Sequence, residues 1–292
     1  MKLISIPPEP IDQPRGEAAV PLRYEDVAQD GRLVLETAGQ GIGEAVWRQL
    51  LAHLPERELF RETGIVPILT RICTVGGAGP FSVDAAVAGS GTFAIGVQQD
   101  RVYVDMWAKL EARHGRTYEA QADRGGPPVV ALRTFAEHVM TRLFAPPDQR
   151  KVSAVPGLTV APRAHTLSDV ATMLVPPPAA ELLDGELVAD SQPFVFGLRH
   201  TDSNQHVNSL VYPRLFEEAV VRRLAARGRS AAVLATEVDC SYRKPCFAGD
   251  VMRFWLQAFV LEGEPGAVGV LLPEGTTPTT HKPHTFVRML LR

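Results

Sequence analysis

The sequence predicts an α+β protein that contains two curved antiparallel sheets, each wrapped round one long helix. Three observations lead to this fold class. The same order of elements, a strand, a helix and then a meander of strands, occurs twice along the 292 residues. A Pro-rich stretch separates the two occurrences, and the length suits about two domains. Two such sheets joined edge to edge would bury their helices and remove two free sheet edges.

The domain organisation follows from where this order begins, stops and begins again. The first residues are polar and rich in proline, and Pro-Pro and Gly-Gly pairs punctuate the middle of the chain, as is typical of connecting segments. We therefore expect an N-terminal arm at 1–18, a first domain at 19–130, a connector with helical pieces at 131–192 and a second domain at 193–292.

The first domain opens with a predicted strand at 19–27 that enters a turn at Gln29-Asp30-Gly31. Apolar residues at helical spacing predict a helix at Gly43–Leu54, which Pro55 ends. Runs rich in β-branched and aromatic residues predict the strands 64–75, 81–88, 91–97 and 101–112. The intervening Gly-Gly-Ala-Gly-Pro, Gly-Ser-Gly and Gln-Gln-Asp segments are predicted turns.

The connector contains one predicted helical segment, Leu132–Phe144. In the second domain we expect a strand at 193–202 and a helix from Tyr212 to about Arg227, closed by Gly228 as a C-terminal cap. The remaining apolar runs predict strands at 231–246, 251–263, 266–274 and 280–292.

Composition excludes several classes of protein. Hydrophobic residues make up 45% and charged residues 22%, and the net charge is −3, which argues against a nucleic-acid partner. Three cysteines without C-x-x-C spacing indicate neither a disulfide scaffold nor a structural zinc site, and the histidines are scattered. We expect no metal and no cofactor. Without a signal peptide or an apolar run of membrane-spanning length, we also expect a cytoplasmic monomer or homodimer that does not bind a membrane.

The most informative segment runs from Arg199 to Tyr212. It places a carboxylate, amides and an imidazole within a few residues of one another, between a predicted strand end and a predicted helix start. Backbone N–H groups converge at a helix N-terminus, so an oxyanion or a polarised carbonyl would be stabilised there. A base, an orienting group and a proton carrier are the parts that acid–base catalysis needs.

These residues resemble a known family. The pattern D-x-N-x-H-V-N-x-x-x-Y, from Asp202 to Tyr212, is similar to the active-site signature of hotdog-fold thioesterases. The layout is most similar to the double-hotdog acyl-acyl carrier protein thioesterases, and the Y-x-x-P and Gly-Asp segments at 242–250 add to the resemblance. It covers about 190–292 well and 19–114 weakly. It implies a double hotdog that hydrolyses an acyl thioester of acyl carrier protein or coenzyme A, in fatty acid or polyketide metabolism.

The resemblance also implies roles for individual residues. Asp202, Asn204, His206 and Glu218 would form the catalytic network, with a carboxylate of Glu218 or Asp202 acting as general base or nucleophile. Glu217 is the neighbour of that helix carboxylate. The remaining motif positions would contact substrate: Val207, Asn208 and Tyr212.

The sequence departs from the family pattern at Ser209, where a second Asn is usual. It also departs at Pro213, and we expect the helix to begin near this residue, with Pro213 in its first turn. The first half has no H-V-N motif and carries Gly39–Glu44 at the place that corresponds. We therefore expect one active site, in the second half, with the first half shaping the acyl pocket.

Other interpretations stay open at this stage. Asp202, Ser203 and Asn204 are also common turn and helix-capping residues, Glu218 could lie on a solvated helix face, and Cys246 has the character of a small buried hydrophobe. The arginines from Arg214 to Arg229 suit either the C-terminus of the helix or a dock for an acidic carrier protein or coenzyme A phosphates. A protein of this fold could instead transfer the acyl group to an alcohol or amine, or bind acyl chains without catalysis. The polar motif argues against the last function.

Overall fold

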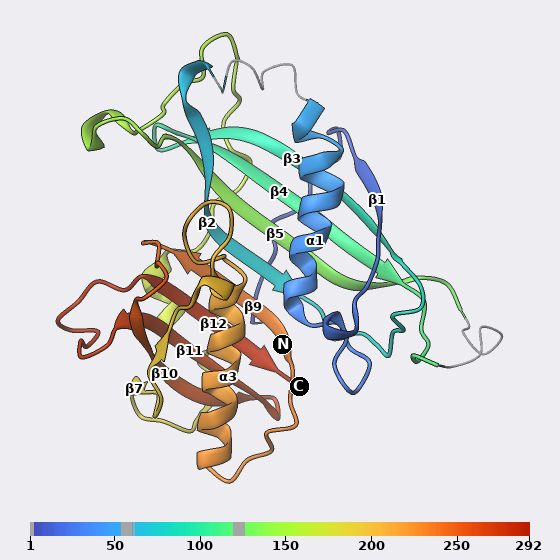
Figure 1. Cartoon of the computed structure of the whole chain (residues 1–292), viewed down its shortest axis with the longest axis vertical. Coiled ribbons are helices and arrows are strands. Elements are labelled where there is room, and N and C mark those ends of the chain that lie inside the picture. The colour runs from blue at the N-terminus through green and yellow to red at the C-terminus, as the bar shows by residue number, and fades with distance from the viewer. Residues whose placement is uncertain (1–2, 54–59, 61, 119–125) are drawn as a thin grey trace. The chain divides into compact units, whose positions relative to one another are not determined.

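The computed structural model describes residues 3–53, 60, 62–118 and 126–292. Its chain divides into two compact units, which we call the N-terminal unit (Ile6–Leu167) and the C-terminal unit (Ser168–Arg292 with Met1–Ser5). Each unit pairs an antiparallel sheet with a helix that lies on it, as Figure 1 shows. The predicted α+β class with antiparallel sheets is confirmed, and each unit is described by itself below.

The sheet of the N-terminal unit has the strand order β1-β3-β4-β5-β2, and every neighbouring pair is antiparallel. Gln99 and Asp100 adopt positive φ angles of 47° and 57° and make the tight turn between β3 and β4, as the sequence predicts. The strand bounds are β1 (Gly16–Val20), β2 (Ile65–Val75), β3 (Val87–Gln98), β4 (Arg101–Ala112) and β5 (Val129–Arg142).

One helical run crosses this sheet against β1, β3 and β4 (Figure 1). It begins as a tight turn at Leu35–Thr37, continues as α1 (Ala38–Gly41) and widens into a π-type helix at Ile42–Arg48. Val46 is fully buried, and a Cβ atom on Gly91 of β3 would lie 2.6 Å from its Cγ2 atom. Glycine is therefore required on β3 for the helix to pack this closely.

The part of the predicted N-terminal arm from Ile6 onward belongs to this unit. The indole Nε1 of Trp107 on β4 donates a hydrogen bond to the carbonyl of Pro7 at 3.0 Å. The hydroxyl of Thr92 on β3 donates one to the carbonyl of Pro14 at 2.8 Å. Prolines cannot donate from their own nitrogen, but their carbonyls satisfy these buried sheet side chains and hold the arm on the strands.

In the C-terminal unit the main strands follow the order β9-β12-β11-β10, all antiparallel. Short strands at 181–195 add to the outer edge of β10. The bounds are β6 (Glu181–Leu182), β7 (Val188–Ala189), β8 (Phe194–Val195), β9 (Ala235–Tyr242), β10 (Val251–Leu261), β11 (Glu264–Pro273) and β12 (Thr285–Leu291).

The helix α3 (Val211–Ala226) packs on β9, β10 and β12 (Figure 1). It ends as predicted, because Gly228 takes a φ of +67° and its N–H bonds to the carbonyl of Ala225. Phe216 is fully buried, and a Cβ on Gly269 of β11 would come within 2.6 Å of its ring. Pro213 falls in the first helical turn, where its missing N–H costs no helical hydrogen bond.

The predicted helix Gly43–Leu54 is wrong in its bounds. The helical run starts at Leu35 and its π-type part ends at Arg48, while Leu54 and Pro55 lie outside the described residues. Three glycines at 39, 41 and 43 have low helix propensity, which favoured a loop there. Packing overrides that preference, since a Cβ on Gly41 would sit 3.1 Å from the Leu110 side chain.

The predicted helix Leu132–Phe144 is also wrong, because this segment forms most of β5. Its apolar residues fall at helical spacing, but β5 pairs with β4 on one side and β2 on the other. Adjacent residues of β5 such as Phe135 and Ala136, which point to opposite faces, are both buried, so its residues do not alternate cleanly between apolar and polar. The predicted turn Gly89-Ser90-Gly91 likewise lies inside β3.

No helix among the described residues is both long and apolar enough to cross a bilayer. Within the same residues, no cluster of three or more His, Cys, Asp or Glu side chains has the arrangement of a metal site.

Candidate active site

The predicted motif lies on a tight turn that leads into α3. We call Gly197–Asn208 the motif turn. A short helical turn at Leu198–His200 is followed by an antiparallel bridge between Thr201 and Val207. Across the enclosed residues, the Asp202 N–H donates to the His206 carbonyl at 3.2 Å. The chain therefore folds back on itself and gathers the polar residues between the two bridge positions.

The carboxylate of Asp202 is the best-held polar group of this turn. Its Oδ1 accepts a hydrogen bond from the backbone N–H of Asn204 at 2.8 Å. Its Oδ2 accepts one from the side-chain amide of Asn208 at 3.0 Å, and the Asn208 oxygen accepts from the Leu210 N–H at 2.9 Å. Asp202 is half-buried, so its carboxylate is oriented and still reachable by water. The predicted substrate contact Asn208 thus orients a neighbouring carboxylate.

His206 is half-buried on the same turn. Its Nδ1 lies 3.1 Å from the backbone oxygen of Val207, and a carbonyl oxygen can only accept a hydrogen bond. In the neutral imidazole this contact places the proton on Nδ1 and leaves Nε2 as a hydrogen-bond acceptor. The side chain of Asn204 is exposed at the tip of the turn. Asp202, Asn204 and His206 therefore share one turn, as predicted.

Val207 and Tyr212 lie buried beneath the turn. The sequence analysis predicted that both side chains contact substrate. The Val207 N–H donates to the carbonyl of Cys246 at 2.8 Å, and the Cys246 N–H donates to the Tyr212 hydroxyl oxygen at 3.1 Å. Burial is the main cause that raises the pKa of Tyr212 above its usual range. These contacts fix the turn onto the loop that follows β9.

The thiol of Cys246 is fully buried, and its Sγ lies 3.4 Å from Nδ1 of His284. Burial raises the pKa of this thiol to about 12, while burial and the nearby Lys244 charge lower the pKa of His284. The pair is a neutral thiol beside a neutral imidazole at pH 7. Because the thiolate is the nucleophilic form of cysteine, the structure gives Cys246 no such role.

Glu218 lies on the exposed face of α3, in its second turn. Its Oε2 is 4.0 Å from Nη1 of Arg222, one turn further on. Within the described part of the chain, no hydrogen bond or ion pair joins Glu218 to the motif turn. The neighbouring Glu217 accepts a hydrogen bond from the Ala235 N–H at 2.9 Å, which holds the start of β9.

The motif turn has a counterpart in the N-terminal unit, at 23–34, which we call the N-terminal turn. The two match at a constant offset of 174 residues (202 − 28). In the N-terminal turn a helical turn at Tyr24–Asp26 precedes a bridge between Val27 and Leu33. The Ala28 N–H donates to the Arg32 carbonyl at 2.8 Å, which matches the bond from Asp202 to His206.

Further contacts repeat at the same offset. Gly31 and Gln205 both take positive φ, at 87° and 65°. The Val34 N–H bonds to the Asp26 carbonyl at 3.1 Å, as the Asn208 N–H bonds to the His200 carbonyl at 2.9 Å. The prediction that Gly39–Glu44 corresponds to the motif is therefore wrong, because those residues lie in the helix. The counterpart of the motif is 28–34.

The side chains of the N-terminal turn cannot perform the same chemistry. Ala28, Asp30, Arg32 and Val34 stand where the motif has Asp202, Asn204, His206 and Asn208. Asp30 accepts from the Arg32 guanidinium at 2.7 Å, so its carboxylate is neutralised by an ion pair. The carbonyl of Gly31, at the tip of the turn, accepts from the Phe81 N–H at 2.7 Å.

The offset also relates the two helices. Glu44 and Arg48 of the first helix form an i, i+4 ion pair at 3.1 Å, as Glu218 and Arg222 do in α3. Sequence reasoning missed this repeat, although Glu-Ala-Val-x-Arg is spelled out at 44–48 and again at 218–222. Since the helix acid also occurs beside the turn that lacks the motif, its presence does not by itself indicate catalysis.

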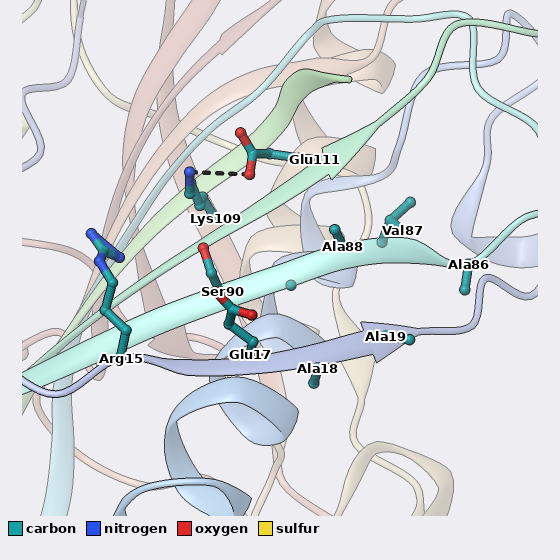
Figure 2. A pocket seen from close by; sticks show the side chains of 11 residues that line it. Arg15, Glu17, Ala18, Ala19, Ala86, Val87, Ala88, Ser90, Lys109 and Glu111 are labelled. Carbon is teal, nitrogen blue, oxygen red and sulfur yellow. Dashed lines mark ion pairs between the residues drawn. The ribbon is translucent and has the colours of Figure 1, made fainter. Parts of the chain in front are cut away.

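A groove of about 600 Å³ lies in the N-terminal unit, along β1, β3 and β4 (Figure 2). Its charged lining is largely neutralised, because Lys109 pairs with Glu111 at 3.0 Å and Arg15 pairs with Glu9 at 2.8 Å. None of the predicted site residues lines it. The groove therefore contains none of the candidate catalytic groups of the motif turn.

Comparison with known proteins found no matching family model and no matching curated protein. Solved structures do match over nearly the whole chain. A candidate oleoyl thioesterase from Lactobacillus plantarum aligns with a TM-score of 0.64 at 14% identity, over 96% of this chain and 97% of that one. An acyl-ACP thioesterase from Bacteroides thetaiotaomicron aligns at 0.55 and 11% identity, over 96% and 97%. The 12:0-ACP thioesterase from Umbellularia californica aligns at 0.55 and 14%, over 95% and 94%.

The chain shares the fold of these thioesterases. The resemblance drawn from the motif is thereby confirmed at the level of the fold, and the low identities carry no further conclusion about activity.

Proposed function

We propose that the protein is a double hotdog that hydrolyses an acyl thioester at the motif turn. The observation that carries the proposal is the fixed carboxylate of Asp202, which accepts hydrogen bonds at 2.8 and 3.0 Å beside His206, on the turn that leads into α3. The N-terminal turn has the same backbone without these groups. The shared fold with acyl-ACP thioesterases supports the same reaction class.

The reaction would proceed by addition of water to the thioester carbonyl. Asp202 takes a proton from the water molecule while the oxygen of that water forms a bond to the carbonyl carbon. The oxyanion that results would lie near the start of α3, where the helix dipole stabilises negative charge. The C–S bond then breaks, the sulfur takes the proton, and a carboxylic acid and a free thiol leave.

Asn204 and His206 would orient the reacting groups in this scheme. The unprotonated Nε2 of His206 can accept a hydrogen bond from water or from the substrate amide. Glu218 remains a second candidate for the general base, and Val207, Asn208 and Tyr212 would shape the turn and the acyl-binding surface. The leaving thiol would belong to acyl carrier protein or coenzyme A.

The test is a panel of acyl-CoA and acyl-carrier substrates in which free thiol release is followed with and without an added alcohol or amine. Purified wild type is compared with Asp202→Asn, His206→Ala and Glu218→Gln. We expect release with water alone. Asp202→Asn should lower kcat about 1,000-fold, and His206→Ala about 100-fold. Thermal melting of each variant checks that the fold is kept.

The outcomes separate the competing functions. Release that requires the added nucleophile identifies an acyltransferase. Acyl binding without release of thiol contradicts hydrolysis and identifies a binding protein. If Glu218→Gln loses activity and Asp202→Asn keeps it, the general base is on α3.

A further inference from the structure

We infer that Tyr242, a residue outside the motif turn, is a positioning residue for the proposed hydrolysis. Its hydroxyl donates a hydrogen bond to the carbonyl of Ser209 at 2.8 Å, just after Asn208. Asn208 in turn bonds to the carboxylate of Asp202. This inference rests on the proposed function and adds a residue on which the geometry of the same site depends.

One chain of hydrogen bonds joins Tyr242 to Asp202. The Ser209 carbonyl, which accepts from Tyr242, belongs to the same peptide group as the Leu210 N–H. That N–H donates to the side-chain oxygen of Asn208 at 2.9 Å, and the Asn208 amide donates to Asp202 at 3.0 Å. A peptide group is planar, so fixing its oxygen also fixes the direction of its N–H. The Tyr242 hydroxyl therefore decides where the Asn208 amide points.

The backbone on the other side of Asn208 is also anchored. The Val207 N–H donates to the carbonyl of Cys246 at 2.8 Å. Tyr242 is the last residue of β9, and Cys246 lies in the loop that follows this strand. Both neighbours of Asn208 are thus held by one segment of the chain, which leaves the Asn208 backbone little freedom to rotate.

The side chain of Tyr242 is itself held in place. Its ring packs against that of Tyr212 with the centroids 5.6 Å apart and an interplanar angle of 66°. Tyr212 accepts the hydrogen bond from the Cys246 N–H, and Tyr242 pairs with Thr285 across β9 and β12. Such edge-to-face packing restricts the motion of both rings. The hydroxyl is therefore presented by a strand and a buried ring, which are rigid supports.

The same bond argues against a direct role in the chemistry. A tyrosine hydroxyl carries one proton, and that of Tyr242 is donated to the Ser209 carbonyl. It cannot be donated to a thioester carbonyl at the same time. Tyr242 thus acts on the reaction through Asn208 and not by contact with the reacting atoms.

The N-terminal turn enters its helix in the same way as the motif turn. The Thr37 N–H donates to the Val34 carbonyl at 3.1 Å. At the 174-residue offset this matches the bond from the Val211 N–H to the Asn208 carbonyl at 3.0 Å. The backbone repeat therefore extends from the turn into the start of the helix.

The two helix entries differ in what holds the next carbonyl. Leu35 stands where Ser209 does (209 − 35 = 174), and its carbonyl accepts from the Ala38 N–H within the helical run. Ala38 also occupies the place of Tyr212. A helix entry of this shape thus forms with a backbone donor in place of a tyrosine hydroxyl. Backbone folding does not require the bond from Tyr242, which occurs in the half where a carboxylate is oriented.

The experiment removes this hydroxyl and keeps the ring, with Tyr242→Phe. We expect kcat for thiol release to fall about 30-fold and KM to stay within about 2-fold, because orienting the base affects the transition state more than substrate binding. The matched control is Tyr103→Phe on β4, a half-buried ring that lies 4.4 Å from the Arg163 guanidinium. It should change neither constant by more than about 2-fold. Thermal melting of both variants checks that the fold is kept.

A double-mutant cycle tests whether Tyr242 acts through Asn208. Adding Tyr242→Phe to Asn208→Ala should lower kcat by less than about 2-fold beyond the single variant. Losses that multiply would mean that Tyr242 acts by another route, and the inference would be overturned. It would also be overturned by an unchanged kcat in Tyr242→Phe, or by a raised KM at constant kcat, which would make Tyr242 a substrate contact.

Amide hydrogen exchange, followed by NMR, separates the inference from the proposed function. In Tyr242→Phe the Leu210 and Asn204 N–H groups, which bond to the Asn208 and Asp202 side chains, should exchange at least about 5-fold faster. The Asp202 N–H, which bonds to the His206 carbonyl, should stay within about 2-fold.

This result would support the positioning role even if the wild type hydrolyses no thioester and the proposed function fails. Unchanged exchange at Leu210 would overturn the positioning role whatever the activity. Faster exchange at all three N–H groups would mean that the hydroxyl only supports the turn, which also overturns it.

Discussion

The motif turn and the N-terminal turn differ in side chains far more than in backbone. Both fold back across a bridge, both take a positive φ at the same place and both lead into a helix with a Glu–Arg pair. One carries a carboxylate held by two donors and the other carries alanine at that position. The comparison teaches that the backbone frame is a structural feature of each unit, and that a few side chains decide which unit has a candidate site.

The charge around the two turns differs in the same way. In the N-terminal turn, arginines and carboxylates pair with one another, and the tip is bonded to Phe81. In the motif turn the tip residues Ser203, Asn204 and Gln205 are exposed. The corresponding Gln29 and Asp30 are exposed as well and Gly31 is half-buried, so the two turns differ in charge and in the bond to Phe81 more than in exposure.

The largest effect should come from exchanging side chains between the turns. Asp202→Ala together with His206→Arg installs the N-terminal residues in the motif turn. We expect thiol release to fall at least about 1,000-fold, because the proposed general base and the proposed orienting imidazole are both lost. The melting temperature should change by a few degrees at most, since the backbone bonds are kept.

The reciprocal exchange serves as the control. Ala28→Asp, Asp30→Asn, Arg32→His and Val34→Asn place the motif in the N-terminal turn, where the Gly31 carbonyl at the tip is bonded to the Phe81 N–H. We expect no gain of activity in a chain that also carries Asp202→Ala. Recovery of turnover would show that the motif alone suffices, and the comparison would then fail.

Low pH should lower the stability of the N-terminal unit. His138 on β5 is buried against Trp47, and burial lowers its pKa to about 4. The unfolded chain takes up this proton near pH 6.5, so the free energy of unfolding should fall as the pH drops from about 6.5 to about 4, by up to about 3 kcal/mol. Urea unfolding of wild type and His138→Leu across this range isolates the contribution. Equal pH dependence in the two proteins would refute it.

A smaller effect concerns how the two helices pack on their sheets. Gly269→Ala places a Cβ about 2.6 Å from the Phe216 ring and 2.5 Å from the Trp255 carbonyl. We expect a loss of about 2 kcal/mol from overpacking. Gly43→Ala in the N-terminal helix meets nothing within 4 Å and should stabilise by about 0.5–1 kcal/mol. Urea midpoints measure both, and stabilisation by Gly269→Ala would mean that the close approach is absent.

The smallest effect should follow the loss of the buried thiol near the motif. Cys246 holds the motif turn through its backbone N–H and carbonyl, which Cys246→Ser keeps. We expect turnover within about 3-fold of wild type in the thiol-release assay. A loss beyond about 100-fold, which is about 2.7 kcal/mol, would instead make this thiol the nucleophile.

Sequence reasoning predicted the C-terminal unit more successfully than the N-terminal one. The bounds of α3 and the strands β9 to β12 were close, because each element is marked by local signals such as Gly228 at the helix end. In the N-terminal unit the signals conflicted. The predicted helix began only at Gly43, after two further glycines of low helix propensity, and the apolar residues of β5 predicted a helix. Packing and pairing with distant strands decided both.

The candidate site shows the same division. The motif predicted which turn would carry the chemistry, but it left open whether Glu218 or Asp202 would serve as the base. The structure holds Asp202 with two donors and leaves Glu218 exposed beside Arg222. The repeat at 174 residues was readable in the Glu-Ala-Val-x-Arg segments, yet those five residues were too short a signal without the matching turns.

By itself the sequence determined the α+β class, the polar motif and its place before a helix, since these depend on composition and on neighbours along the chain. Only the tertiary structure decided which polar groups are held and which arginines are already paired. The reason is physical: a carboxylate or a guanidinium is free or neutralised according to what lies within hydrogen-bonding distance, and those partners come from segments far away in the chain.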